Sequence, residues 1–286
     1  MIGQVSSRLT LALAATTVLL AAFPAASMAA CANPVACENE KAGSAPSAWQ
    51  VSGSGDSTIQ GYATSMSVNV GGTIRFKVKS TASNYHIDIY RLGYYQGNGA
   101  RLQQANVRPT ASLPQTQPAC LTDSATGLID CGNWGVSASW TVPSTSVSGV
   151  YIARLIRDDN GGASQIPFVV RDDAASSDVL VKTSDATWQA YNKYGGNSLY
   201  SCTAPCPPGN PAAYKGAFSV SYNRPFDGAI TQDNGRSYLF YAEYQMIRFI
   251  ERNGYDASYT SQADVAANAA HLLNHKLIIS SGHNEY

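Results

Sequence analysis

The stretch KLIISSGHNEY, residues 276–286, decides the fold class of the second half of the chain. Its apolar run at 277–279 contains two β-branched residues and predicts a buried strand. His283 and Glu285 follow this strand two positions apart, so in an extended backbone their side chains point to the same side. The end of a predicted strand therefore carries two titratable groups that could share one site.

Strand and helix patterns alternate through the residues before this stretch. Apolar residues at spacings of three and four over 237–253 predict an amphipathic helix that ends at Asn253-Gly254. The other predicted elements are strands at 178–183 and 255–260 and a helix at 261–275. This alternation predicts a parallel sheet with crossover helices, in which ligands bind at the carboxyl ends of the strands. Because three strands and two helices leave sheet faces uncovered, we expect residues 173–286 to be the first part of a larger α/β domain.

Residues 49–172 show a different pattern, the period-two alternation of half-buried antiparallel strands. The clearest predicted strands are SMSVNV (65–70), TIRFKVKS (73–80), YHIDIYRL (85–92), SASWTV (137–142) and VYIARLIR (150–157). We therefore predict an Ig-like antiparallel β-sandwich over residues 31–172, joined to the second part by a polar linker at 171–178.

One turn motif and two tryptophans refine this prediction. Asn98-Gly99 predicts a hairpin turn, because both residues tolerate a positive φ. Trp134 and Trp140 are expected in the sandwich core or at its rim, with stacking on a sugar ring as the alternative.

The first thirty residues indicate an exported protein, and the overall charge argues against one class of partner. A single cation at Arg8, an apolar segment and small residues at 27–30 predict a signal peptide over residues 1–30. Met-Ala-Ala-Cys, which ends at Cys31, also resembles a lipoprotein cleavage site, so lipid attachment at Cys31 is the alternative to a secreted or periplasmic protein. The formal net charge of zero argues against a nucleic-acid partner held by a basic patch.

The six cysteines fall into three local pairs, Cys31 with Cys37, Cys120 with Cys131, and Cys202 with Cys206. An even number in an exported chain favours disulfides, and the spacing favours pairing between neighbours. A thiolate metal site or a cysteine nucleophile is the alternative.

Several motifs resemble those of a known enzyme family. They are YHIDIYRLGYYQGNGARL, CLTDSATGLIDCGNW, SDATWQAYNKYGGNSLY, SYNRPF, EYQMIRFIERNGYDASYT and GHNEY. Together they resemble the large (β) subunit of N,N-dimethylformamidase and its exported bacterial relatives. The resemblance covers nearly all of the mature chain, and TWQAYN (187–192), GGNSLY (195–200) and GHNEY (282–286) are its most specific parts.

The resemblance implies a fold, a cofactor and an activity. The C-terminal domain of that family resembles a class I glutamine amidotransferase without its cysteine nucleophile, and it holds one iron ion through two tyrosines and one glutamate. Its activity is hydrolysis of a small linear amide to a carboxylate and an amine. By this resemblance Tyr191, Tyr200 and Glu285 correspond to the iron ligands, and His283 corresponds to an active-site histidine.

This ligand set is chemically consistent with iron. Fe(III) favours anionic oxygen ligands, and two phenolates with one carboxylate would balance its three positive charges. Among the 17 tyrosines, four further candidates are Tyr194, Tyr222, Tyr241 and Tyr244. The alternative for His283 and Glu285 is a pair that caps a following helix.

Other polar residues have simpler interpretations. We expect His86, His271 and His275 to be surface or structural residues. Arg224 in SYNRPF would pair with a carboxylate near the site or form an ordinary salt bridge.

Two functions of different classes follow. The first is an exported metal-dependent amidohydrolase, with a small amide as substrate. The second is a non-catalytic surface protein whose sandwich binds a cell-wall or polysaccharide ligand. The sequence leaves the substrate, the identity of the metal and the oligomeric state open.

Overall fold

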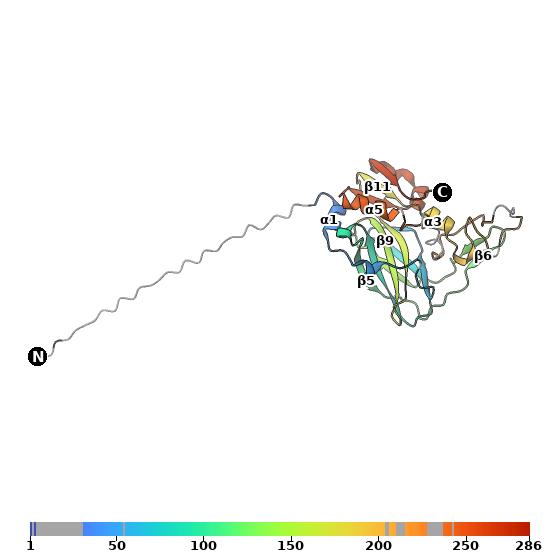
Figure 1. Ribbon diagram of the computed structural model, residues 1–286, viewed down its shortest axis with the longest axis horizontal. Coiled ribbons are helices and arrows are strands. Elements are labelled where there is room, and N and C mark those ends of the chain that lie inside the picture. The colour runs from blue at the N-terminus through green and yellow to red at the C-terminus, as the bar shows by residue number, and fades with distance from the viewer. Residues whose placement is uncertain are drawn as a thin grey trace. The chain divides into compact units, whose positions relative to one another are not determined.

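The computed structural model describes residues 1, 3, 31–53, 55–203, 206–209, 215–227, 237–241 and 243–286. Residues 31–286 form one compact unit, shown in Figure 1. The predicted signal peptide falls almost entirely outside the described residues. Within the described part of the chain, no helix is both long enough and apolar enough to cross a bilayer.

Two β-sheets make up most of the first half. The three-stranded sheet has the order β1 (Ile59–Ala63), β3 (Thr73–Ser80), β8 (Ala138–Thr141). The five-stranded sheet has the order β2 (Ser67–Asn69), β10 (Ala163–Arg171), β9 (Gly149–Arg157), β4 (Tyr85–Leu92), β5 (Ala100–Val107). Neighbouring strands run antiparallel except β2 and β10, which are parallel.

The two sheets share one apolar core. Alternate residues of β3 are buried, as the sequence pattern predicts, and they pack with buried residues of β4, β9 and β10. The rings of Phe76 and Tyr151 each lie 5.8 Å from the ring of Phe168. Full burial of a large apolar side chain stabilises a fold by about 1.5–3 kcal/mol, so this core is a main source of stability.

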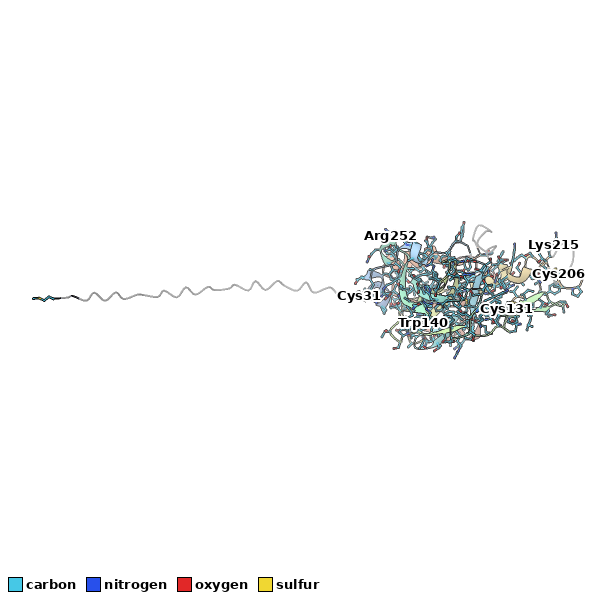
Figure 2. All side chains as sticks on the ribbon, turned by 90° about the horizontal axis from the view of Figure 1, so that it is seen from below. Cys31, Cys131, Trp140, Cys206, Lys215 and Arg252 are labelled. Carbon is cyan, nitrogen blue, oxygen red and sulfur yellow. A yellow bond between two sulfur atoms is a disulfide. The ribbon has the colours of Figure 1, made fainter. Side chains whose placement is uncertain are left out.

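Trp134 and Trp140 both belong to the interior. Trp140 packs against Tyr151 and Phe168 and is 6% exposed, and Trp134 packs against Tyr62 and is 3% exposed. Figure 2 labels Trp140 among the side chains of the compact unit. Burial of this degree leaves neither ring a face for a sugar, so the prediction of core packing is confirmed.

The hairpin between β4 and β5 differs from the two-residue turn predicted at Asn98-Gly99. Its loop contains a 3₁₀ turn, η1 (Tyr95–Gly97), and positive φ values occur at Tyr95, Gln96, Gly97 and Gly99, whereas Asn98 has a φ of −66°. The longer loop has a tertiary cause. Asn39 Oδ1 accepts hydrogen bonds from the backbone nitrogens of Tyr94 and Tyr95, at 2.8 and 2.9 Å.

The second half contains the predicted parallel sheet, in the order β12 (Ala257–Thr260), β11 (Val179–Lys182), β13 (Leu277–Ser280). The prediction that the last strand is buried is wrong, because β13 is an edge strand on which Leu277 and Ile278 are exposed. Its helices are α3 (Asp185–Tyr191), α5 (Glu243–Arg252), α6 (Gln262–Ala267) and the 3₁₀ helix η3 (Ala269–Asn274). Among the described residues, α5 begins at Glu243, and residues 237–241 form turns instead of the predicted first helical turns. The helix predicted at 261–275 is interrupted at Asn268, whose backbone is extended and whose side chain caps Ala270.

The remaining elements lie at the periphery of these sheets. They are α1 (Pro34–Glu40), α2 (Pro46–Trp49), the hairpin of β6 (Leu121–Asp123) and β7 (Leu128–Asp130), and η2 (Tyr194–Gly196). The three predicted disulfides are all present, Cys31–Cys37, Cys120–Cys131 and Cys202–Cys206. Figure 2 labels one cysteine of each.

A buried ion pair joins the two halves. Arg91 of β4 and Glu251 of α5 are both inaccessible to solvent and form two hydrogen bonds, at 2.8 and 2.9 Å. The hydroxyl of Tyr259 on β12 donates to the same carboxylate at 2.8 Å. Around this pair, one apolar cluster contains residues of β9, α3, α5 and β11, and α5 lies between β9 and β11 (Figure 1). The protein is therefore a sheet-rich mixed fold in which both halves share a core.

Candidate functional site

The candidate site lies where two parallel strands end. β11 ends at Lys182 and leads into α3, and β13 ends at Ser280 and leads into GHNEY. Because the strands are parallel, both segments leave the same edge of the sheet. Figure 1 shows the C-terminal residues beside α3.

All four residues predicted for the site meet at this edge. The hydroxyl of Tyr191 donates to Glu285 Oε2 at 2.9 Å, and the same oxygen lies 3.4 Å from His283 Nε2. The rings of Tyr191 and Tyr200 stack, with centroids 4.2 Å apart and planes at 24°. The ring of His283 lies 5.5 Å from that of Tyr191.

The loop between the two tyrosines is organised by Arg224. This arginine is fully buried, and its guanidinium donates to the backbone carbonyls of Gln189, Tyr194 and Asn197, at 2.9, 3.2 and 2.7 Å. Burial lowers the pKa of Arg224 to about 10. The predicted pairing with a carboxylate is therefore replaced by a scaffold role, in which one cation fixes the segment that carries Tyr191 and Tyr200.

Side chains from the β11–α3 segment hold GHNEY in place. The hydroxyl of Ser184 donates to Ser281 O at 3.0 Å, and Lys182 Nζ donates to Asn284 Oδ1 at 2.7 Å. The backbone N–H of Glu285 donates to Thr187 Oγ1 at 3.0 Å. These contacts fix the carboxylate against the helix that carries Tyr191.

Glycine is required at the first position of GHNEY. Gly282 has a φ of +83°, and a Cβ built there would lie 2.7 Å from Glu243 Cγ. Any side chain at this position would meet both the left-handed backbone penalty and a clash. The close approach brings the loop directly onto the first turn of α5.

Glu243 is a buried acid that contacts the segments carrying the site residues. Its Oε1 accepts hydrogen bonds from Trp188 Nε1 at 2.8 Å and from the backbone of Ser184 at 3.3 Å. Burial raises the pKa of Glu243 to about 8, so the carboxyl is protonated at neutral pH. Glu243 therefore links α5, α3 and the GHNEY loop without adding a charge.

The electrostatics keep the two phenols protonated in the absence of a cation. Partial burial, followed by the hydrogen bonds of Tyr286 and Glu285, raises the pKa of Tyr200 far above its ordinary value. Burial and the neighbouring Glu285 carboxylate also raise the pKa of Tyr191. A multivalent cation between these oxygens would reverse the shifts, because it stabilises the ionised phenol.

The donor set fits a hard trivalent cation. Two phenols and a carboxylate can supply three anionic oxygens, the ligands that Fe(III) favours. The side chains remain accessible, since Tyr200 is 40% exposed and the Glu285 side chain is 37% exposed. Among the described residues, no group of three His, Cys, Asp or Glu side chains could hold a metal ion. A metal at this position would therefore depend on tyrosine oxygen.

Comparison with known proteins identifies the family. Residues 86–286 match the family model described as N,N-dimethylformamidase beta subunit-like, C-terminal. The chain belongs to this family. The family takes its name from a subunit of an amidohydrolase, and the match includes the whole candidate site. A search of curated proteins finds no match to the chain.

In this dimethylformamidase beta subunit-like chain, the four rival tyrosines have other surroundings. Tyr194 packs against Trp134, the hydroxyl of Tyr222 donates to Asp185, and that of Tyr244 donates to Gly99 O. Tyr241 is 52% exposed. Tyr191 and Tyr200 are the two that lie beside Glu285.

The other histidines have local partners, as expected. His86 Nδ1 contacts Asp158, His271 Nδ1 contacts Asn268 O, and His275 Nδ1 contacts Ser177 O. All three contacts lie outside the tyrosine cluster.

Sequence reasoning missed three neighbours of the site. Tyr286 shares a hydrogen bond of 2.6 Å with the hydroxyl of Tyr200, Ser237 Oγ lies 3.3 Å from His283 Nδ1, and Thr187 accepts from Glu285 N. Tyr286 and Thr187 lie inside the GHNEY and TWQAYN motifs, so the motifs themselves carried a signal for both. Ser237 lies outside every motif quoted, and only the fold brings it to the site.

Proposed function

We propose that this chain is an exported metal-dependent amidohydrolase that cleaves the C–N bond of a small amide. In this proposal Tyr191, Tyr200 and Glu285 bind one ferric ion, and His283 is the catalytic histidine. The observation that carries the proposal is the meeting of two phenols, one carboxylate and one imidazole at the carboxyl edge of the parallel sheet. Family membership supports amide hydrolysis as the reaction.

The protein's own groups prepare the site for a cation. The hydroxyl of Tyr191 donates its proton to the carboxylate of Glu285, and the hydroxyl of Tyr200 shares a hydrogen bond with that of Tyr286. Each phenol therefore has a neighbouring group through which its proton can leave. A bound ferric ion would polarise the substrate's amide oxygen and make its carbon more electrophilic. The exposure of Tyr200 and Glu285 leaves room for a small amide to approach from solvent.

His283 is suited to move the proton of the reaction. Its Nδ1 faces Ser237 Oγ at 3.3 Å, and its Nε2 faces the carboxylate of Glu285. Hydrolysis adds the hydroxyl of water to the amide carbon and breaks the C–N bond, and the remaining proton of the water must reach the leaving nitrogen. We assign this transfer to His283 Nε2, because general acid–base catalysis needs a positioned group that can both accept and donate a proton, as an imidazole nitrogen can.

The finer fold assignments belong to the same proposal. The two sheets around one core support an Ig-like sandwich in the first half. The order β12-β11-β13, with the candidate ligand residues at the carboxyl edge, supports a class I glutamine amidotransferase-like fold in the second half. The signal-peptide pattern and the three disulfides support export.

The test compares Tyr191→Phe with the matched control Tyr194→Phe in the full chain. Phenylalanine at 191 keeps the stacked ring but removes the oxygen, so we expect iron content to fall at least about tenfold. Release of dimethylamine from N,N-dimethylformamide, or of ammonia from formamide, should be lost. Tyr194→Phe should behave as the wild type, because Tyr194 packs against Trp134. Iron content and amide hydrolysis that are equal in both variants and the wild type would refute the proposal.

A further inference from the structure

A cleft lies on the face of the five-stranded sheet that is turned away from the three-stranded sheet, and residues of the tyrosine cluster do not line it. It has a volume of about 500 Å³ and lies between residues 49–52, β10 and α5. Gln165 of β10 lines the cleft and lies on the same side of the strand as Val169, which packs with residues of α5. Ile166 and Phe168 lie on the other side of β10, in the core between the two sheets. Clefts of this size commonly bind small molecules.

One wall of the cleft is aromatic. Trp49 stacks on Phe240 with ring centroids 6.4 Å apart, and Tyr244 meets both rings edge-on, at 5.8 and 5.6 Å. Trp49 and Tyr244 are almost fully buried, whereas Phe240 is partly exposed and presents apolar surface to the cleft. This wall would suit the C–H face of a ring-shaped ligand.

Two polar groups in the cleft have unused hydrogen-bonding capacity. Gln165 is 8% exposed, and its Oε1 finds no hydrogen-bond partner among the described residues. Arg248 Nε is also buried without a partner in the described structure, and its guanidinium lies 5.7 Å from the centre of the Tyr244 ring. Buried polar atoms are nearly always hydrogen-bonded. A ligand with one donor for Gln165 Oε1 and one acceptor for the Arg248 guanidinium would supply the missing hydrogen bonds.

The charge of the lining selects the class of ligand. Arg248 is cationic, and none of the described residues that line the cleft is Asp or Glu. The other polar groups are the amides of Gln50 and Gln245 and the hydroxyl of Ser52, which suit hydroxyl groups. The combination of an apolar ring, amides and one guanidinium indicates a ligand with hydroxyls and a carboxylate.

We propose that this cleft binds a sugar residue that carries a carboxylate, such as a uronic-acid unit of an acidic polysaccharide. Arg248 pairs with the carboxylate, Gln165 Oε1 accepts a hydrogen bond from a ring hydroxyl, and Phe240 contacts the C–H face. The cleft is open to solvent, so a polymer can continue beyond the bound unit. This inference is independent of the metal site, because it uses different residues and a different ligand.

The test measures binding to the full chain by titration calorimetry. The probe is a trimer of galacturonic acid, and its fully methyl-esterified form is the matched ligand control. We expect the acidic trimer to bind and the ester to bind at least about tenfold more weakly, because esterification removes the charge that Arg248 recognises. Absence of binding by the acidic trimer at millimolar concentration, or equal binding of the ester, would overturn the proposal.

Two variants assign the binding to this cleft. Arg248→Gln should weaken binding at least about tenfold, whereas Arg252→Gln, one turn later on α5 with its guanidinium over Tyr94, should leave binding unchanged. Gln165→Leu should weaken binding and raise the Tm of the ligand-free protein, because it removes a buried acceptor that has no partner. A Tm of ligand-free Gln165→Leu below that of the wild type, or unchanged binding by Arg248→Gln, would contradict the assignment.

Discussion

Replacement of Glu243 by Gln should change how the stability of the protein depends on pH. The side chain is 3% exposed, and burial raises its pKa from 4.5 to about 8. Between these two values the unfolded chain has lost the proton that the folded chain keeps. Raising the pH across this interval therefore destabilises the folded state, and below pH 4.5 the effect vanishes.

The magnitude follows from the size of the shift. Each pH unit within the interval changes the free energy of unfolding by about 1.4 kcal/mol, so the rise from 4.5 to about 8 costs about 5 kcal/mol in total. Glutamine has the same shape and cannot ionise, and its Oε1 can still accept from Trp188 Nε1 and Ser184 N. Glu243→Gln should therefore match the wild type near pH 4.5 and exceed its stability by several kcal/mol at pH 8.

Denaturant unfolding between pH 4.5 and 8, followed by tryptophan fluorescence, measures this difference. The control is Glu40→Gln, because the Glu40 side chain is exposed and the exchange should leave the pH dependence of the wild type intact. Parallel curves of unfolding free energy against pH for the wild type and Glu243→Gln would show that the buried carboxyl does not hold its proton, and the reasoning would fail.

Three further outcomes are expected. Arg91→Met should lower the free energy of unfolding by about 3–5 kcal/mol, because it leaves Glu251 buried without its cation, and the double variant with Glu251→Leu should recover most of this loss in denaturant unfolding. Gly282→Ala should lower the free energy of unfolding by about 1–3 kcal/mol more than Gly254→Ala does. Both glycines have a positive φ, but only Gly282 has a side chain within 4 Å of the added methyl group. Equal losses of unfolding free energy in the two variants would argue against close packing at Gly282. Transfer of one ferric ion per chain from a soluble ferric chelate to metal-free protein at pH 7 should release about two protons more than the same transfer to the double variant with Tyr191→Phe and Tyr200→Phe, because both phenols start protonated. A pH-stat measures the difference, and equal release from both proteins would contradict ligation by the two tyrosines.

The regular elements could be predicted because their patterns are local. The alternation in TIRFKVKS and YHIDIYRL gives β3 and β4 with the predicted limits, and the three strands predicted in the second half form the parallel sheet. The meeting of Tyr191, Tyr200, His283 and Glu285 followed from motif resemblance together with strand ends. Neither source needed a long-range contact.

The errors occur where distant residues determine local structure. The loop before β5 is set by Asn39, more than fifty residues away, and so departs from the turn that Asn98-Gly99 favours. Arg224 was expected to meet a carboxylate, but four backbone carbonyls satisfy it instead. The sequence pattern did not single out Glu243 as a buried acid, because its burial depends on contacts with Trp188, Ser184 and Gly282, which lie far away in the sequence.

The ion pair between Arg91 and Glu251 has a consequence for how such proteins can diversify. The sequence pattern changes near residue 172, which looks like a natural point for exchanging one module for another. A first half transferred to a new fusion partner would bring a fully buried arginine whose counter-ion stays behind on α5. Recombination at this point should therefore succeed only when the incoming segment supplies a carboxylate in the same place, so the two halves are expected to be inherited together.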